Sequence, residues 1–467
     1  MTGREPWFRT LLIANRGEIA LRIARTCREA GINVAAVYST EDADTTLVRT
    51  ADVAVRIGPP PARQSYLNMA AILEAARRCG ADAIHPGYGF LAENADFSAA
   101  CAANGIAFVG PSAAVIATLG DKVRARMLLA GHGMPMLPGS LHPVGDVTEA
   151  AAVAGQTGFP LIIKAAAGGG GRGMQVVHEP AQLAERYRGT RSAAQQLFGD
   201  HRVYIERYIA GARHVEIQIL CDAFGNALHL GERDCSVQRR HQKIVEETPA
   251  PGLPHALVQR MAAAAIEGAR AAGYVGAGTF EFLVDEAQNF YFMEVNCRIQ
   301  VEHPVTEMAT GIDLVREQLR IAAGHPIQLR QADIRPRGAV IECRVNAEDP
   351  DRGFAPAPGR LTEFSPPAGP FVRVDTYAHP GCRISAAYDS LLAKVVVAAP
   401  DREQAIARMH RALAEFRVSG PGVTTTIPFL HRVLDDPAFR RGAHDTRLVA
   451  SMLDGADRRA VPASAPA

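Results

Sequence analysis

Two glutamates in one stretch of the chain, Glu281 and Glu294, are placed to bind a metal ion. Apolar runs at 279–284 and 290–295 flank the polar loop 285–289, and their aromatic and β-branched content predicts a β-hairpin. If the loop closes near Ala287 and Gln288, Glu281 lies opposite Glu294. Because like charges opposed across strands are unfavourable, the pairing indicates a cation between them. Magnesium is the first choice where nucleotide phosphates complete the shell.

The residues after Glu294 continue the alternation of the second strand. The side chains expected on one face are Glu294, Asn296, Arg298, Gln300 and Glu302. Acids at both ends and a guanidinium in the middle suit an anionic substrate beside a metal. The alternative is the solvated face of an edge strand, because antiparallel sheets commonly expose one face.

A glycine-rich segment is a second candidate for chemistry. The short apolar strand 161–164 ends in Lys164, and A-A-A-G-G-G-G-R-G-M follows and runs to Met174, where a strand resumes. Glycines have no side chains to pack and lose much backbone entropy on ordering. We therefore expect a mobile flap whose N–H groups close over phosphates, with a flexible linker as the alternative. The segment lacks the G-x-x-x-x-G-K-[ST] pattern of a Walker loop.

The thirteen residues 231–243, G-E-R-D-C-S-V-Q-R-R-H-Q-K, carry four positive side chains and two acids with scarcely an apolar one. An anion site and a solvated loop are equally compatible with this composition. Shortly before it, the segment 213–220 alternates, with His214, Glu216 and Gln218 on its polar face.

The elements that must position these residues begin with a parallel α/β domain. A strand at 10–14, an amphipathic helix at 18–30 and a strand at 33–38 form a β-α-β unit. This unit lacks G-x-G-x-x-G, which argues against a dinucleotide site within it. Farther on, P-G-Y-G-F-L-A-E-N at 86–94 follows a strand, where open α/β sheets bind ligands. An ordinary strand-to-helix turn is equally compatible with that segment.

Length and composition narrow the class of protein. The 467 residues predict about three domains. A net charge of +1 without a basic patch argues against nucleic acid as a partner. No signal peptide or membrane-spanning run is present, so no membrane association is expected. Eight scattered cysteines without C-x-x-C spacing predict reduced thiols in a cytoplasmic protein.

Six segments together resemble biotin carboxylase, an ATP-grasp enzyme. They are I-A-N-R-G-E-I-A at 13–20, the motif at 86–94, the glycine flap, R-H-V-E-I-Q at 213–218, the motif at 231–243, and F-M-E-V-N-C-R-I-Q-V-E-H-P-V-T-E at 292–307. The resemblance covers nearly all of residues 8–450. It implies a multidomain α/β and α+β fold. The domains are an N-terminal Rossmann-like domain at 1–120, an ATP-grasp domain at 121–334 with a lid at about 135–205, and a mixed C-terminal domain at 335–450. A disordered tail is expected at 451–467.

The resemblance also implies the roles of individual residues. Those expected to bind ATP are Lys122, Lys164, Gly170, Gly171, Glu206, Arg207, Tyr208, Ile209, His214, Gln238 and His241. Glu281 and Glu294 would bind Mg²⁺ or Mn²⁺ with help from Asn296, in agreement with the hairpin. Bicarbonate would lie against Lys243, Arg298, Gln300 and the backbone of Val301, with Glu302 as the base. Arg344 would stabilise the enolate-like biotin, and Tyr88 would lie near biotin.

The partners follow from the same resemblance. Biotin arrives on a carrier lysine in an A/V-M-K-M motif, which this sequence lacks. We therefore expect a separate biotin carboxyl carrier protein, carboxyltransferase subunits and a homodimer, as in a bacterial-type acetyl-CoA carboxylase of fatty acid synthesis.

Three alternatives stay open. One is another carboxyl acceptor, such as propionyl-CoA, pyruvate or urea. Another is a non-catalytic nucleotide-binding regulator, which the retained acids and basic residues argue against. The last is a different ATP-grasp ligase, such as a carbamoyl-phosphate or peptide ligase.

Overall fold

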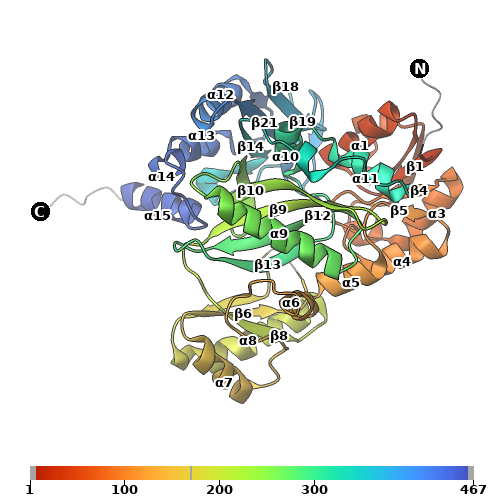
Figure 1. The fold of residues 1–467 in the computed structure, drawn as a ribbon. Coiled ribbons are helices and arrows are strands. Elements are labelled where there is room, and N and C mark those ends of the chain that lie inside the picture. The colour runs from red at the N-terminus through yellow and green to blue at the C-terminus, as the bar shows by residue number, and fades with distance from the viewer. Residues whose placement is uncertain (1–6, 169–170, 461–467) are drawn as a thin grey trace, which may run out of the picture.

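The computed structural model describes residues 7–168 and 171–460. Figure 1 shows an N-terminal domain in red and orange, a lid in yellow, a central sheet in green and a C-terminal part in blue. Within the described residues, no helix combines the length and apolar character needed to cross a membrane.

The N-terminal domain is built on a five-stranded parallel sheet in the order β3-β2-β1-β4-β5. The strands are β1 (Thr10–Ile13), β2 (Asn33–Ser39), β3 (Val53–Gly58), β4 (Ala83–His85) and β5 (Ala107–Phe108). The helices are α1 (Gly17–Glu29), α2 (Thr46–Thr50), α3 (Met69–Cys79), α4 (Ala95–Ala103) and α5 (Ala113–Gly120). Asn68, Asn94 and Ser112 cap α3, α4 and α5 by accepting backbone N–H bonds. The expected parallel α/β fold is confirmed.

The central sheet has eight antiparallel strands in the order β13-β12-β9-β10-β11-β14-β21-β19. Their bounds are β9 (Arg213–Cys221), β10 (Ala227–Arg239), β11 (Gln242–Thr248), β12 (Gly276–Val284), β13 (Phe290–Asn296), β14 (Ala339–Asn346), β19 (Val372–Thr376) and β21 (Leu391–Ala399). Helix α9 (His255–Ala271) lies across one face (Figure 1), and α10 (His303–Thr310) and α11 (Leu314–Ala322) follow β13. Because β11 pairs with β14, the sheet continues across the boundary expected at residue 334.

The lid is a separate three-stranded antiparallel sheet, β7-β6-β8, which lies below the central sheet in Figure 1. It contains β6 (Leu161–Ala165), β7 (Met174–Val177), β8 (Val203–Arg207), α7 (Val147–Thr157) and α8 (Leu183–Phe198), and α6 (Lys122–Ala130) precedes it. The glycine segment joins β6 to β7, which pair directly with each other.

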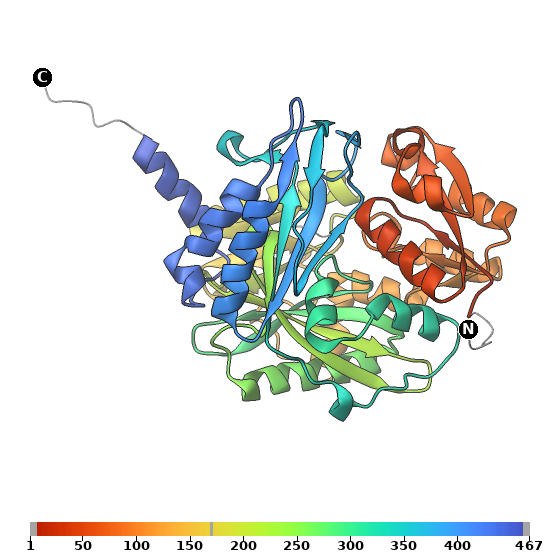
Figure 2. The ribbon, with the colours of Figure 1, turned by 90° about the horizontal axis from the view of Figure 1, so that it is seen from above.

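The C-terminal part packs helices beside β14, β21 and β19, as Figure 2 shows from above. The helices are α12 (Arg402–Glu415), α13 (Ile427–Asp435), α14 (Pro437–Arg440) and α15 (Leu448–Ala460). Short strands form three further pairs: β15 (Glu348–Asp349) with β16 (Ala355–Pro356), β17 (Gly359–Arg360) with β20 (Arg383–Ile384), and β18 (Glu363–Ser365) with β22 (Arg417–Ser419).

Helix α15 corrects the expectation of a disordered tail from residue 451. It runs to Ala460, because Leu448 and Val449 are buried and Met452 and Leu453 pack against the core. Residues 461–467 lie outside the described residues.

The end of strand β13 corrects the expectation that the strand continues from Glu294 to Glu302. It ends at Asn296, so Arg298, Gln300 and Glu302 lie on an irregular turn before α10 rather than on a strand face. The edge-strand alternative also fails there, because Gln300 and Glu302 are buried. The segment 231–243 is likewise no solvated loop, since β10 and β11 contain most of it.

We expect Phe280→Ala to destabilise the protein strongly. Phe280 is fully buried, and its ring centroid lies 6.3 Å from that of Phe292 in the core beneath the hairpin. Replacing such a side chain costs about 3–5 kcal/mol through lost burial and the cavity left behind. Urea unfolding measures the loss. Phe224→Ala is the control, because Phe224 is 63% exposed, and a loss no larger than that control's would contradict the packing described.

Candidate active site

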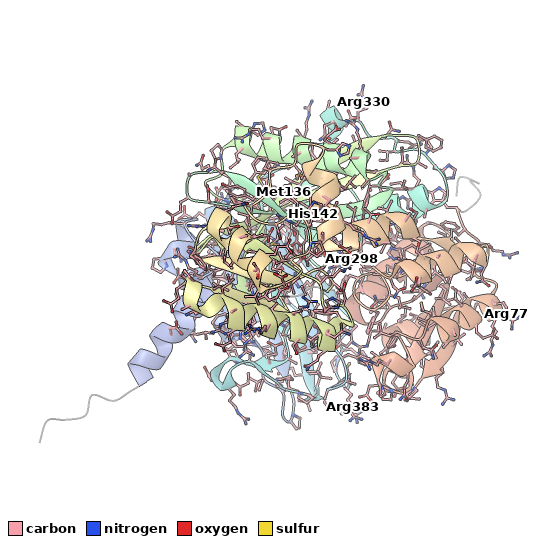
Figure 3. The ribbon with its side chains drawn as sticks, turned by 90° about the horizontal axis from the view of Figure 1, so that it is seen from below. Arg77, Met136, His142, Arg298, Arg330 and Arg383 are labelled. Carbon is pink, nitrogen blue, oxygen red and sulfur yellow. The ribbon has the colours of Figure 1, made fainter. Side chains whose placement is uncertain are left out.

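A cavity of about 1750 Å³ lies between the N-terminal domain, the lid, the central sheet and the C-terminal part. The expected site residues that line it are Tyr88, Lys122, Lys164, Gly171, Arg207, Tyr208, Ile209, His214, Gln238, His241, Lys243, Glu281, Glu294, Asn296, Arg298, Gln300, Val301, Glu302 and Arg344. Gly170 lies outside the described residues. Figure 3 looks from the lid side, and in this view Arg298 lies beside the lid helices, toward the N-terminal domain. Residues far apart in the sequence therefore share one cavity.

Three glutamates stand side by side on adjacent strands. Glu216 on β9 is in register with Glu281 on β12, and Glu281 is in register with Glu294 on β13. The predicted opposition of Glu281 and Glu294 is thus confirmed. Next to this row, Arg233 on β10 donates from Nε to Glu216 Oε1 at 2.6 Å. Like charges so arranged repel each other, so the row depends on the cations around it.

Lys243 supplies most of that compensation. Its Nζ donates to Glu216 Oε2 at 2.6 Å, to Glu281 Oε1 at 2.8 Å and to Glu302 Oε1 at 2.6 Å. Burial would lower the pKa of this ammonium, but the surrounding acidic groups raise it well above its usual value. Burial would likewise raise the pKa of Glu281, but Lys243 and His214 hold it well below its usual value.

The same place offers ligand atoms for a metal. Single ligand atoms of His214, Glu216 and Glu281 lie within 4.8 Å of one another. At the other end of the row, Glu294 forms an ion pair with Lys122. The amide of Asn296 donates to Glu281 Oε1 at 2.9 Å. These buried or half-buried carboxylates form a site suited to a hard divalent cation.

Arg298 is fixed in orientation by neighbours from two domains. Its Nε donates to Glu93 Oε2 at 2.9 Å, and Glu93 belongs to the 86–94 loop of the N-terminal domain. Its Nη1 donates to Gln300 Oε1 at 3.0 Å and its Nη2 to Asn296 Oδ1 at 2.8 Å. The guanidinium is held in a fixed orientation and places a positive charge on the cavity wall, where it can attract an anion.

Glu302 lies between two cations. It is fully buried, with Lys243 on one carboxylate oxygen and Arg344 Nη2 at 2.9 Å on the other. Burial would raise the pKa of Glu302, but Lys243 and Arg344 hold it well below its usual value. Arg344 is anchored on the far side, where its Nε donates to Glu246 Oε1 at 2.6 Å.

The lid contributes Lys164 and the glycine segment. Lys164 Nζ lies 2.6 Å from Glu206 Oε2, and Arg126 pairs with the same carboxylate. Glu206 is 1% exposed and lies behind the cavity wall, so its side chain positions Lys164. Gly171 has φ +74°, and a Cβ there would meet His241 Cδ2 at 2.2 Å. The glycine is therefore required for the flap to approach His241 closely.

Several residues of the site were not predicted as site residues. They are Glu93, Arg126, Glu216, Arg233 and Glu246. The alternation at 213–220 and the motifs at 86–94 and 231–243 contain three of them. Their places depend on which strands become neighbours, and local sequence does not determine that order.

Comparisons with known proteins agree with this arrangement. Three family models match in sequence order: biotin carboxylase, N-terminal domain, at residues 7–116; carbamoyl-phosphate synthase L chain, ATP binding domain, at 121–330; and biotin carboxylase C-terminal domain at 342–451. Biotin carboxylase 1 of Bacillus subtilis is 50% identical over 94% of this chain and 97% of its own length.

Two solved structures extend the likeness to the fold. A crystal structure of biotin carboxylase from Campylobacter jejuni in complex with beta-gamma-ATP has a TM-score of 0.93 at 44% identity, covering 95% of this chain and 99% of that one. The biotin carboxylase domain dimer of 2-oxoglutarate carboxylase from Hydrogenobacter thermophilus, in complex with MgADP, ADP and bicarbonate, has a TM-score of 0.92 at 44% identity, covering 96% and 98%.

The fold and the ATP-binding domain match define an ATP-grasp enzyme of the carboxylating ligase class. Within that class, the chain belongs to the biotin carboxylase family.

We expect Lys243→Met to lower stability at neutral pH by about 3–5 kcal/mol, because three carboxylates lose a buried partner. Lys243 lowers the pKa of Glu281 and Glu302, so the stability that they contribute is present above the usual glutamate value of 4.5 and is lost as the pH falls below it. The deficit of the variant should therefore shrink on acidification.

Urea unfolding in metal-free buffer between pH 7 and about pH 4 tests this expectation. Arg9→Met is the control, because the Arg9 side chain is 78% exposed and its charge pair with Asp82 is long at 3.9 Å. A deficit that stays constant over the whole range would contradict the assigned pKa shifts.

Proposed function

We propose that this chain carboxylates biotin, using ATP and bicarbonate, through carboxyphosphate. The observation that carries the proposal is the opposed pair Glu281 and Glu294 beside the buried cluster of Lys243, Arg298 and Glu302. One side of the cavity suits a metal-bound nucleotide and the adjoining side suits a small anion. A phosphoryl group can pass between the two with little covalent help, because this transfer depends mainly on positioning and neutralisation of charge.

On the nucleotide side, the side chains fit phosphates and a cation. The residues assigned to ATP are Lys122, Lys164, Gly170, Gly171, Glu206, Arg207, Tyr208, Ile209, His214, Gln238 and His241. The side chain of Glu206 would act through Lys164, which it holds in place. Glu281 and Glu294 would hold Mg²⁺ or Mn²⁺, and Asn296 orients Glu281 through its amide. The donor set fits a hard cation, because all its ligand atoms are carboxylate oxygens. When bound, the metal would neutralise part of the negative charge of the phosphates.

On the anion side, bicarbonate is assigned to Lys243, Arg298, Gln300 and the backbone of Val301. Glu302 would remove the bicarbonate proton. With Lys243 and Arg344 both bound to it, Glu302 is a weak base, because both cations lower its pKa. An anion that accepts hydrogen bonds from Lys243 would share that lysine with Glu302. When bicarbonate shares Lys243 in this way, the pKa of Glu302 rises and the carboxylate becomes a stronger base.

The second chemical step is assigned to Arg344, which lies directly beside Glu302. Carboxyphosphate breaks down to CO₂ and phosphate, the phosphate removes the ureido proton of biotin, and the biotin anion takes up CO₂. Arg344 would stabilise the negative oxygen of that anion. Its guanidinium is already oriented by Glu246 and Glu302, so little ordering remains to be done. Tyr88 lines the same cavity.

The partners proposed are a biotin carboxyl carrier protein, carboxyltransferase subunits and a second copy of this chain, with acetyl-CoA as the final acceptor. The near full-length match to biotin carboxylase 1 of Bacillus subtilis supports this assignment. The 2-oxoglutarate carboxylase domain, at 44% identity, keeps another acceptor open. The eight free cysteines suit the reducing cytoplasm.

The first test is ADP release by the purified protein with magnesium, ATP and bicarbonate, with and without free biotin. We expect release that depends on biotin. Glu294→Ala should lower it about 100-fold or more, because one metal carboxylate and the partner of Lys122 are lost. Glu286→Ala, in the exposed turn of the same hairpin, is the control. Nucleotide binding without ADP release, with biotin or a biotinylated carrier, would favour the non-catalytic regulator.

We expect Arg344→Ala to slow transfer of labelled bicarbonate onto biotin by about 100-fold, because the biotin anion loses its cation. The acid limb of the pH–rate profile should move to higher pH, since Arg344 lowers the pKa of Glu302. Arg330→Ala is the control, because the Arg330 side chain is 83% exposed. Transfer at the parent rate by Arg344→Ala would refute the role.

A further inference from the structure

Lysine is rare in this chain, and its few positions are not scattered. Only four of the fifty lysine and arginine residues are lysines: Lys122, Lys164, Lys243 and Lys394. The first three line the cavity. Lys394, on β21 in the C-terminal part, does not line it and is fully buried. The chain has arginine at almost all its other basic positions but a lysine at this buried one. The contacts of the Lys394 ammonium explain the choice.

The ammonium of Lys394 joins three parts of the molecule. Its Nζ donates to the carbonyl oxygen of Val301 at 2.8 Å, on the turn between β13 and α10. It also pairs with Glu18 Oε1 of α1, in the N-terminal domain, at 3.0 Å. Asp375 of β19 lies farther away, at 3.9 Å. An ammonium directs its three donors to separate points, whereas a guanidinium is planar, so arginine would not reproduce these contacts.

Glu18 extends the connection to Tyr88 in the 86–94 loop. The hydroxyl of Tyr88 donates to Glu18 Oε1, the oxygen that also pairs with Lys394. Glu18 Oε2 has no partner among the described residues. One carboxylate oxygen therefore holds both the ammonium under the Val301 turn and the hydroxyl of Tyr88.

The turn itself has little regular structure to hold it. Between the end of β13 at Asn296 and the start of α10 at His303 the backbone forms neither helix nor strand. This turn carries Arg298, Gln300, Val301 and Glu302. A buried charged donor on the Val301 carbonyl is a strong constraint, because hydrogen bonds from charged groups are stronger than neutral ones.

We propose that Lys394 and Glu18 are positioning residues that fix the Val301 turn and Tyr88 together, and so align the bicarbonate end of the cavity with the biotin end. The inference rests on the proposed function for the identity of the two substrates. Lys394 acts through the Val301 backbone, and Glu18 acts through the Tyr88 hydroxyl. Lys394 does not line the cavity, and Glu18 lies on its wall beside Tyr88, to which it is hydrogen-bonded.

The test compares steady-state constants of the full chain for bicarbonate, biotin and ATP. Lys394→Met removes the donor to Val301 and should raise the KM for bicarbonate about 10-fold. Glu18→Gln weakens the hold on Tyr88 and should raise the KM for biotin more than that for bicarbonate. The KM for ATP should change less than about twofold in both, because Lys122, Lys164 and the flap lie on the other side of the cavity. A general loss of structure would raise all three constants.

Asp375→Asn is the matched control, because it removes a charge near Lys394 without touching Val301 or Glu18. It should leave the KM for bicarbonate and biotin unchanged.

The double variant Lys394→Met with Glu18→Gln tests whether the two residues act together. Expressed as free energies, its change in KM should be smaller than the sum of the changes in the two single variants, because both substitutions disrupt the same ion pair.

Three results would overturn the inference: an unchanged bicarbonate KM in Lys394→Met, equal changes for all three substrates, or full additivity in the double variant. If Lys394→Met does not fold, Glu18→Gln decides alone, and an unchanged biotin KM overturns the inference. Failure of the proposed function is distinguishable, because the parent protein itself would then release no ADP in response to biotin.

Discussion

The repulsion among carboxylates on neighbouring strands is the constraint on which the rest of the site depends. Glu216, Glu281 and Glu294 stand in register on β9, β12 and β13. The row is tolerated because cations reach it from separate parts of the chain: Lys122 from the start of α6, and Arg233 and Lys243 from β10 and β11. Removing charges from water is costly unless each is paired. The fold must therefore bring these segments together before the row can form.

The hairpin and the parallel domain could be predicted because both are local. A short polar loop between two apolar runs predicts the hairpin, but the opposition of Glu281 and Glu294 also depends on a register shift between Glu281 and Phe282, which the spacing does not reveal. Glu216 could not be placed in the same way. Its position beside Glu281 depends on β9 lying next to β12. The two glutamates are 65 positions apart in the sequence, and helix α9 lies between their strands.

Two predictions from the sequence were wrong: a strand that continues past Asn296 and a disordered tail that begins at residue 451. Both have the same physical cause. The alternation of polar and apolar residues after Glu294 has a period of two, but the chain leaves the strand at Asn296. Contacts from elsewhere hold the turn that follows; for example, the Cys297 N–H donates to Glu93 Oε1 at 2.8 Å. Helix α15 was missed because the Ala- and Arg-rich sequence lacks an obvious core stripe. Leu448 and Val449 pack against elements distant in sequence. In each case tertiary contacts override a local pattern.

The pairing of β11 with β14 also bears on how the chain can be divided. The expected boundary at residue 334 lies between two strands that share one ladder of backbone hydrogen bonds, Val245 with Cys343 through Thr248 with Val340. Separating the parts there would leave β11 and β14 each with an unpaired edge, and such edges are templates for intermolecular strand pairing. The ATP-binding and C-terminal parts are therefore not interchangeable modules, whereas the lid, with its own sheet, is the segment that can vary independently.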